Sequence, residues 1–286
     1  MELTNKLILG TVQLGLDYGI NNYSGKPTLD KSMNILGKAR SLGIQVLDTA
    51  EAYGNAMDII GEYHKVHEPF KIISKLKYSG IALARLIESQ LVRLNVDHLH
   101  ILFLHHFEDI FNLKVMDELN ALKLDKTVSK IGVSVYTNEQ ARTVADLDTI
   151  DVIQLPFNLM DNYYQRGSIL SYAKKNKKEI HARSVFLQGL FFMKEDRLPA
   201  KLNPLLPTLS QIKKIAVEEH FSIEQLALGY ALYQQEIDAV LIGVDTESQL
   251  ETNFRLSKIK LSPAIVEKIN EIHVEFPELL LPINWN

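Results

Sequence analysis

Eight short apolar stretches, each followed by a stretch with helical periodicity, are the feature of this sequence that most restricts its fold. Strands that are apolar along their whole length are typical of parallel sheets, which are covered on both faces. Eight strand–helix units in 286 residues predict an α/β protein, a single-domain (β/α)8 TIM barrel spanning residues 1–286. The expected strands lie at residues 6–10, 44–48, 71–77, 99–104, 130–135, 152–156, 179–184 and 239–244.

A doubly wound α/β fold is the alternative for a chain that alternates strands with helices. It is less favoured because the chain has too many strand–helix units and no G-x-G-x-x-G after its first strand. Segment 189–208 contains three prolines and predicts a long functional loop. Residues 277–286 are expected to form a C-terminal tail, whose Trp285 lies either over the mouth of the barrel or against its side.

Polar residues that precede helical patterns predict where several helices begin, because their side chains can accept a hydrogen bond from the first turn. We expect such caps at Thr28, Asn138, Ser222, Thr246 and Ser262. The segment between the first strand and Lys26 contains no clear helical pattern, so it is expected to be an irregular polar loop.

Composition and charge exclude several classes of function. The absence of cysteine excludes disulfides, thiolate metal sites and a cysteine nucleophile. The net charge of −4 and the lack of a basic patch predict no nucleic-acid partner. Apolar stretches are too short to span a bilayer, and no secretion signal is evident, so we expect a cytoplasmic protein without a membrane partner. His98 and His100 are expected at the opposite end of the barrel, so no metal site is predicted. Oligomeric state has no signal in the sequence.

Ionisable side chains follow the carboxyl ends of three consecutive strands. Asp48 ends the second strand and Tyr53 follows in its loop, while Lys75 and His105 end the third and fourth strands. Because side chains at the carboxyl ends of barrel strands converge on one mouth, we expect these four to meet there. The simpler alternative is that Asp48 caps the next helix and Tyr53 packs on the surface.

These residue types suit proton transfer to a carbonyl oxygen. A phenol with an ordinary pKa of about 10 is a poor proton donor at neutral pH, and a neighbouring ammonium lowers that value. A carboxylate beside the ammonium keeps it charged, and a neutral imidazole can hydrogen-bond the carbonyl oxygen. None of the four is a good nucleophile in this setting, so attack on the carbonyl carbon requires a cofactor such as reduced nicotinamide.

Motifs along nearly the whole chain resemble those of the aldo-keto reductase superfamily. They are Leu9-Gly10-Thr11, Asp48-Thr49-Ala50, Ala52-Tyr53-Gly54, Ser74-Lys75-Leu76, Leu104-His105, Ile131-Gly132-Val133-Ser134, Gln154-Leu155-Pro156-Phe157-Asn158, Gln188-Gly189-Leu190, Ile242-Gly243, and Gln249-Leu250-Glu251 with Asn253. The resemblance implies a nicotinamide cofactor, NADP(H) in most members, and a small-molecule carbonyl substrate. It also implies a catalytic tetrad, which here is Asp48, Tyr53, Lys75 and His105.

The same resemblance implies which residues would bind the cofactor. Arg183 occupies the position from which many members stack a tyrosine on the nicotinamide ring. The adenosine phosphates would lie near Gln188 and at the start of the helix after strand eight, where backbone N–H groups favour anions. The full set implied is Thr11, Ser134, Gln154, Arg183, Ser184, Gln188, Gly189, Gly243, Thr246, Gln249 and Asn253.

Three departures from the family pattern bear on ligand choice. Val135 stands where an asparagine often contacts the nicotinamide carboxamide. A cation at Arg183 would disfavour the oxidised, positively charged ring, or would meet an anionic substrate such as a carboxylated or phosphorylated sugar. Where NADPH-selective members carry Lys or Arg, the stretch 243–249 carries Asp245 and Glu247 and no cation, so NAD(H) is also expected as a cofactor.

The expected function is therefore reduction of an aldehyde or ketone to an alcohol with NAD(P)H, tyrosine acting as proton donor. The polar loop after the first strand favours a sugar or sugar-derived carbonyl. Two alternatives remain open: a barrel that binds the cofactor without turnover and serves a regulatory role, and a redox-neutral sugar epimerase or isomerase that retains its cofactor.

Overall fold

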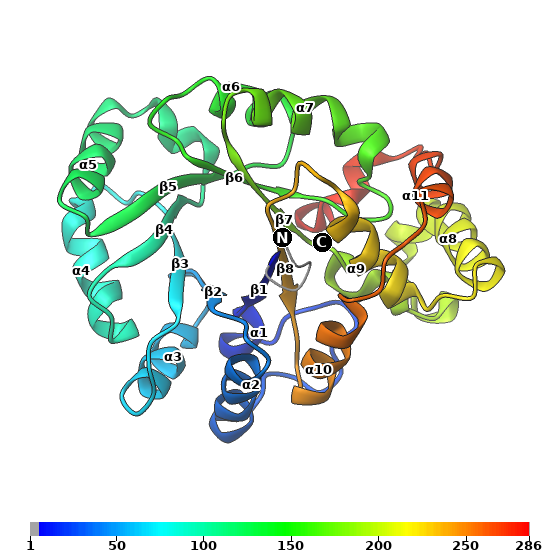
Figure 1. Cartoon of the computed structure of the whole chain (residues 1–286), viewed down its shortest axis with the longest axis horizontal. Coiled ribbons are helices and arrows are strands. Elements are labelled where there is room, and N and C mark those ends of the chain that lie inside the picture. Colours follow the sequence, from blue (N-terminus) through cyan, green and yellow to red (C-terminus); the bar gives the residue numbers. More distant parts are fainter. Residues whose placement is uncertain (1–5, 286) are drawn as a thin grey trace.

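Eight parallel strands closed into a barrel form the centre of the computed structural model, which describes residues 6–285. The strands pair in chain order, and β1 closes the ring by pairing with β8. Figure 1 shows the strands converging at the centre, with the helices arranged around them. This topology confirms the (β/α)8 barrel and excludes the doubly wound fold. The strands are β1 (Leu7–Gly10), β2 (Val46–Asp48), β3 (Lys71–Leu76), β4 (Leu99–Leu104), β5 (Val128–Ser134), β6 (Val152–Pro156), β7 (Glu179–Arg183) and β8 (Ala239–Gly243).

Except for α1, which lies in the segment expected to be an irregular loop, the helices follow the predicted periodic stretches, with bounds that differ by a few residues at several ends. They are α1 (Val12–Gly15), α2 (Leu29–Ser41), α3 (Ala56–His64), α4 (Leu83–Leu94), α5 (Leu113–Leu124), α6 (Asn138–Ala145), α7 (Tyr163–Lys175), α8 (Leu206–Glu218), α9 (Ile223–Tyr233), α10 (Glu247–Leu256) and α11 (Pro263–Asn270). The segment before α8 contains three short 3₁₀ helices, η3 (Leu187–Phe192), η4 (Glu195–Arg197) and η5 (Ala200–Leu205).

Two predictions about helix starts are wrong. The cap of α6 is Thr137, not Asn138: the Thr137 hydroxyl accepts the N–H of Gln140, whose side chain binds back to the cap in a capping box. The periodic pattern also predicts a helix at about residues 168–174, but this helix, α7, begins earlier, at Tyr163, because the Asn162 side chain accepts the N–H of Tyr164. The predicted caps Thr28, Ser222, Thr246 and Ser262 are confirmed.

The interior of the barrel is apolar in its middle and polar towards each end. Ile73, Ile101 and Phe103 belong to a small buried cluster inside the strands, separate from the larger core beneath the helices. Towards the amino ends of the strands, Glu179 accepts from His181 at 2.8 Å and pairs with Lys130. Burial disfavours the Glu179 carboxylate, but these two partners lower its pKa to about 2. Within residues 6–285, no group of three or more potential ligands is placed to hold a metal ion.

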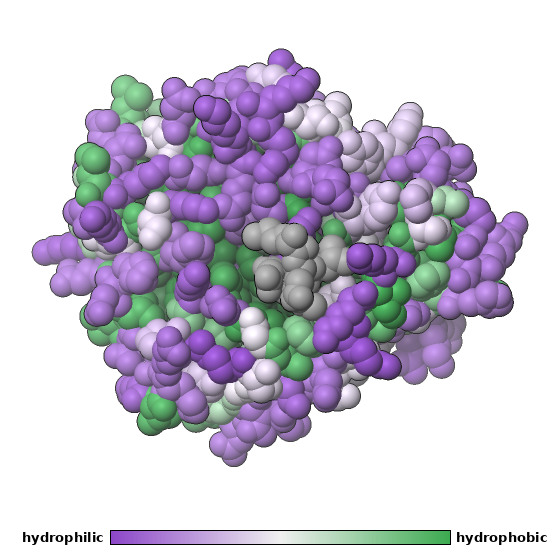
Figure 2. All heavy atoms as spheres, viewed as in Figure 1, coloured by the Kyte–Doolittle hydropathy of each residue, from purple (hydrophilic) through white to green (hydrophobic). Residues whose placement is uncertain are grey.

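The outer face shown in Figure 2 is largely hydrophilic, with apolar residues visible between the polar side chains. None of the described helices has the length and apolar character needed to cross a membrane. The tail forms two short 3₁₀ helices, η6 (Pro277–Leu280) and η7 (Pro282–Asn284). The indole N–H of Trp285 donates to the Leu279 carbonyl at 2.7 Å, and the ring packs on the core.

Candidate active site

The four predicted catalytic side chains converge at the carboxyl end of the barrel. Lys75, at the end of β3, has an exposed fraction of only 2%, and its ammonium forms an ion pair with Asp48. The same nitrogen lies 3.5 Å from the Tyr53 hydroxyl. The rings of Tyr53 and His105 meet edge to face, with centroids 6.5 Å apart. Asp48 therefore does not cap α3, whose N-cap is Asn55.

Both carboxylate oxygens of Asp48 are occupied by buried partners. Oδ1 binds Lys75, and Oδ2 accepts from the Gln154 amide Nε2 at 2.9 Å. The hydroxyl of Thr11 donates to the Asp48 backbone carbonyl at 3.0 Å, so β1 also supports this residue. These contacts fix the carboxylate, which in turn fixes the ammonium next to Tyr53.

The local electrostatics set different charge states on Lys75 and His105. Burial disfavours the ammonium, but attraction to Asp48, with a smaller contribution from Tyr53, raises the pKa of Lys75 above its ordinary value. Burial, followed by the charges of Lys75, His106 and Arg183, lowers the pKa of His105 to about 4. At neutral pH the site thus places a charged ammonium and a neutral imidazole near the phenol of Tyr53.

Two glycines let the loop after β1 pack against the backbone of Tyr53. A Cβ at Gly15, the last residue of α1, would lie 1.8 Å from the Tyr53 carbonyl oxygen. Gly54 has φ of +55°, and a Cβ there would lie 2.4 Å from the Gly15 carbonyl oxygen. Only glycine permits this approach, so helix α1, which sequence patterns did not predict, holds the turn that carries Tyr53.

A cavity of about 680 Å³ extends from these four residues to the start of α10. Its lining includes every residue predicted to bind the cofactor except Thr246. The Thr246 hydroxyl accepts the N–H of Gln249 at 3.2 Å, so this side chain caps α10. The lining residues that sequence reasoning did not select for the site include Asn21, Asn22, Tyr136, Phe186 and Phe192. The described tail residues do not line the cavity.

The loop after β1 closes across the cavity onto the loop after β7. The Ile20 N–H donates to the Gln188 carbonyl at 3.1 Å, and the Gln188 amide donates to the Tyr18 hydroxyl at 2.9 Å. The pKa of Tyr18 is raised above its ordinary value, mainly by burial. Gln188 and Gly189 adopt positive φ values of +54° and +89°. The sequence indicates such a conformation only at the glycine.

Arg183 ends β7 on the side of the barrel opposite Lys75. Its guanidinium lies over the Tyr136 ring, 4.4 Å from the centroid. It donates to the Val135 carbonyl at 3.2 Å and to the Ser184 hydroxyl at 3.4 Å. Among residues 6–285, Arg183 forms no ion pair with a carboxylate.

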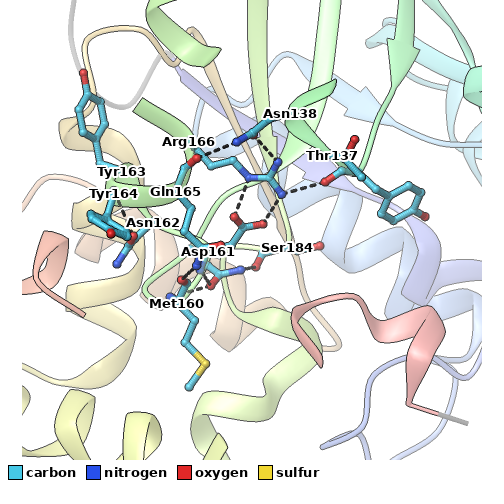
Figure 3. Close-up of polar contacts among 12 residues, drawn as sticks. Thr137, Asn138, Met160, Asp161, Asn162, Tyr163, Tyr164, Gln165, Arg166 and Ser184 are labelled. Carbon is cyan, nitrogen blue, oxygen red and sulfur yellow. Dashed lines mark hydrogen bonds and ion pairs between the residues drawn. The ribbon is translucent and has the colours of Figure 1, made fainter. Parts of the chain in front are cut away.

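A second arginine stabilises the loops around Arg183, and Figure 3 shows its contacts. Arg166 of α7 forms two hydrogen bonds to the carboxylate of Asp161, at 2.6 and 2.7 Å. It also donates to the Asn138 side chain and to the Tyr136 carbonyl, both at 2.8 Å. Arg166 is 8% exposed and Asp161 2% exposed, so this is a buried pair with its main donors satisfied. Sequence patterns did not single out either residue.

The donors and acceptors of the cavity fit a nicotinamide cofactor. The Oε1 atom of Gln154 is buried without a partner, so it can accept from a carboxamide N–H. Asp245 and Glu224 line the far part of the cavity, next to α10. Arg255 and Lys258, near the end of α10, do not line the cavity and so do not offset these acids: Arg255 is exposed, and the Lys258 ammonium lies over the Phe254 ring.

Comparisons with known proteins agree with this geometry. The model of the Aldo/keto reductase family matches residues 6–274. The chain is 26% identical to L-galactose dehydrogenase of Arabidopsis thaliana, covering 78% of this chain and 77% of that protein. It is 22% identical to the NADH-specific methylglyoxal reductase of Escherichia coli, covering 93% and 98%. A holo-form aldo-keto reductase from Bacillus halodurans superposes with a TM-score of 0.77 at 16% identity, covering 94% and 92%.

Proposed function

The chain belongs to the aldo/keto reductase family of NAD(P)H-dependent oxidoreductases, and we propose that it reduces the aldehyde or ketone group of a hydroxylated, sugar-derived substrate. The observation that carries this proposal is the buried contact of Lys75 with both Asp48 and the Tyr53 hydroxyl. The polar lining from the loop after β1, including Gln13 and Asn21, supports a hydroxylated substrate. The relatives named for L-galactose and methylglyoxal also act on small oxygenated molecules.

In this proposal Tyr53 donates its hydroxyl proton to the carbonyl oxygen of the substrate. Lys75 remains charged, because Asp48 raises its pKa, and its positive charge stabilises the phenolate that Tyr53 becomes. His105 is neutral at the working pH and hydrogen-bonds the same carbonyl oxygen, which fixes the direction of the reacting group. A bound reduced nicotinamide supplies the hydride.

Cofactor contacts are proposed for the residues that line the cavity. Gln154, Ser134 and Thr11 lie at the nicotinamide end, and Arg183 and Ser184 complete that end from β7. Gln188, Gly189, Gly243, Gln249 and Asn253 line the remainder. Thr246 contributes as the cap that fixes the start of α10. Because Asp245 and Glu224 face this part of the cavity, NAD(H) is accepted as well as NADP(H).

The experiment that tests the proposal compares the native protein with Tyr53→Phe on a panel of sugar-derived aldehydes. We expect oxidation of the reduced cofactor by the native protein, and a loss of about 10²–10⁴-fold in the variant, the usual size of a general-acid contribution. Cofactor affinity, measured by fluorescence titration, should be unchanged. Tight cofactor binding with no turnover of any carbonyl would identify a regulatory barrel instead. Interconversion of two sugars without net cofactor oxidation would identify an epimerase or isomerase.

A further inference from the structure

We propose that Arg183 binds an anionic group of the substrate, a carboxylate or a phosphate, so that the site prefers anionic carbonyl compounds over neutral ones of the same shape. This inference rests on the proposed function, because it assigns a substrate class to the same cavity. The observation behind it is a partly buried guanidinium, at the end of β7, whose hydrogen-bonding capacity is mostly unused.

The unused donors of Arg183 can be counted. A guanidinium has five N–H donors in a planar fork. The Val135 carbonyl takes one and the Ser184 hydroxyl another, which leaves three, and the side chain lines the cavity. Charged side chains that are partly removed from water are normally paired, and a carboxylate or a phosphate accepts two parallel bonds from this fork.

The guanidinium is also held in place before any ligand binds. The Tyr136 ring covers one face of it, and the Tyr136 backbone is fixed at both ends: its N–H donates to Gln140 at 2.8 Å, and its carbonyl accepts from Arg166 at 2.8 Å. An anion that binds Arg183 therefore meets an ordered side chain, which lowers the entropic cost of binding.

The charges that line the cavity favour an anion at this position. The lining contains two cations, and one of them, Lys75, is neutralised by its ion pair with Asp48. His105 is neutral at pH 7, so among the described residues that line the cavity Arg183 is the one cation without a carboxylate partner. Glu224 and Asp245 line the cavity on the side of α9 and α10. An anionic substrate is thus attracted to the catalytic end and repelled from the opposite end.

The test uses two pairs of substrates in which one member carries an anionic group that the other lacks, with reduced cofactor at saturation. Succinic semialdehyde against butanal tests a carboxylate, and glyceraldehyde 3-phosphate against glyceraldehyde tests a phosphate. The variants are Arg183→Gln, which removes the charge, and Arg183→Lys, which keeps it without the fork. The matched control is Arg142→Gln, because Arg142 also lies on a tyrosine ring, that of Tyr172, at 4.2 Å but outside the cavity.

We expect native kcat/KM to be higher for the charged member of at least one pair. Arg183→Gln should lower that value by about 10- to 100-fold more than it lowers the value for the neutral member, the range of a charge-assisted hydrogen bond. Arg183→Lys should retain part of the preference and Arg142→Gln all of it. The pair that responds identifies the anion as carboxylate or phosphate.

Two results would overturn the inference: no preference for the charged members in the native protein, or an equal loss on charged and neutral members in Arg183→Gln. If the native protein turns over none of the four compounds, the proposed function fails, and anion binding still decides the inference. Calorimetric titration of the cofactor-loaded protein with succinate and with inorganic phosphate then gives the answer. Binding that is lost in Arg183→Gln supports it, and binding that is absent or unchanged contradicts it.

Discussion

Arg166 and Arg183 contact the same tyrosine from opposite ends, but they differ in how fully they are paired. Arg166 donates to the Tyr136 carbonyl and also binds Asp161 and Asn138, so it is buried among matched partners. Arg183 lies on the Tyr136 ring and donates to two neutral oxygens only. A cation with a complete set of partners fixes loops, whereas a cation that is held in place but incompletely paired is available to a ligand.

The largest difference between the two arginines should appear in folding stability. Asp161→Asn leaves Arg166 buried without its counter-charge, which should lower the free energy of unfolding by about 3–5 kcal/mol. Arg183→Gln removes a charge that has no ion pair among the described residues, so the change should be within about 1 kcal/mol. Urea unfolding with an unchanged m value measures both. Equal losses in the two variants would mean that Arg183 has a structural role comparable to that of Arg166.

A smaller effect is expected on the protonation of His105. Its pKa of about 4 is lowered mainly by burial, then by Lys75, His106 and Arg183. Arg183→Gln should therefore raise this pKa, measured by NMR, but leave it below 6.5, because burial and Lys75 remain. Arg166→Gln should have no comparable effect, provided that the variant remains folded. A His105 pKa that is unchanged in Arg183→Gln would show that the Arg183 charge does not act on His105.

The lowered pKa of His105 also determines how folding stability changes with pH. Between pH 6.5 and about 4 the unfolded chain holds a proton on His105 that the folded chain lacks. The contribution of His105 to stability is therefore complete above pH 6.5 and is lost as the pH falls towards 4. In Arg183→Gln the two pKa values are closer, so this loss should be smaller. Urea unfolding across this pH range compares the native protein with the variant.

The smallest expected effect is on the choice between NADH and NADPH. It concerns the acidic end of the cavity, which lies away from Arg183. Because Asp245 and Glu224 would repel a 2′-phosphate, the dissociation constants for NADH and NADPH should differ by less than about a hundredfold, or 2.7 kcal/mol. Asp245→Asn should shift the ratio towards NADPH by about a few-fold. Titration of the apoprotein measures these constants. A native preference for NADPH above a hundredfold would show that a cation reaches this end.

Much of the arrangement of the candidate site could be predicted from sequence, because the carboxyl ends of all strands in a parallel barrel lie around one mouth. Asp48 ends β2, Lys75 lies one residue before the end of β3 and His105 directly follows β4, so their approach follows from the fold alone. Gln154 lies in the middle of the apolar strand β6, but its bond to Asp48 was not predicted, since it depends on a side-chain rotamer.

What the sequence did not predict depends on the conformation of loops. The pairing of Asp161 with Arg166 requires a loop in which Asn158 accepts the N–H of Asp161, and no periodic pattern encodes this. The position of the Tyr136 ring beneath Arg183 also depends on a loop conformation, because Thr137 rather than Asn138 caps α6. Both threonine and asparagine can cap a helix. Because Thr137 is the cap here, the Asn138 side chain is available to accept from Arg166.

The contact between Gly15 and Tyr53 links the choice of substrate to the chemistry. The segment that follows Gly15 carries Tyr18 and Asn21, which line the cavity, so changes there can alter which molecules are accepted. Gly15 itself has no such freedom, because any larger residue would displace the backbone of Tyr53. In the segment after β1, changes of specificity are therefore expected beyond α1 and not at Gly15.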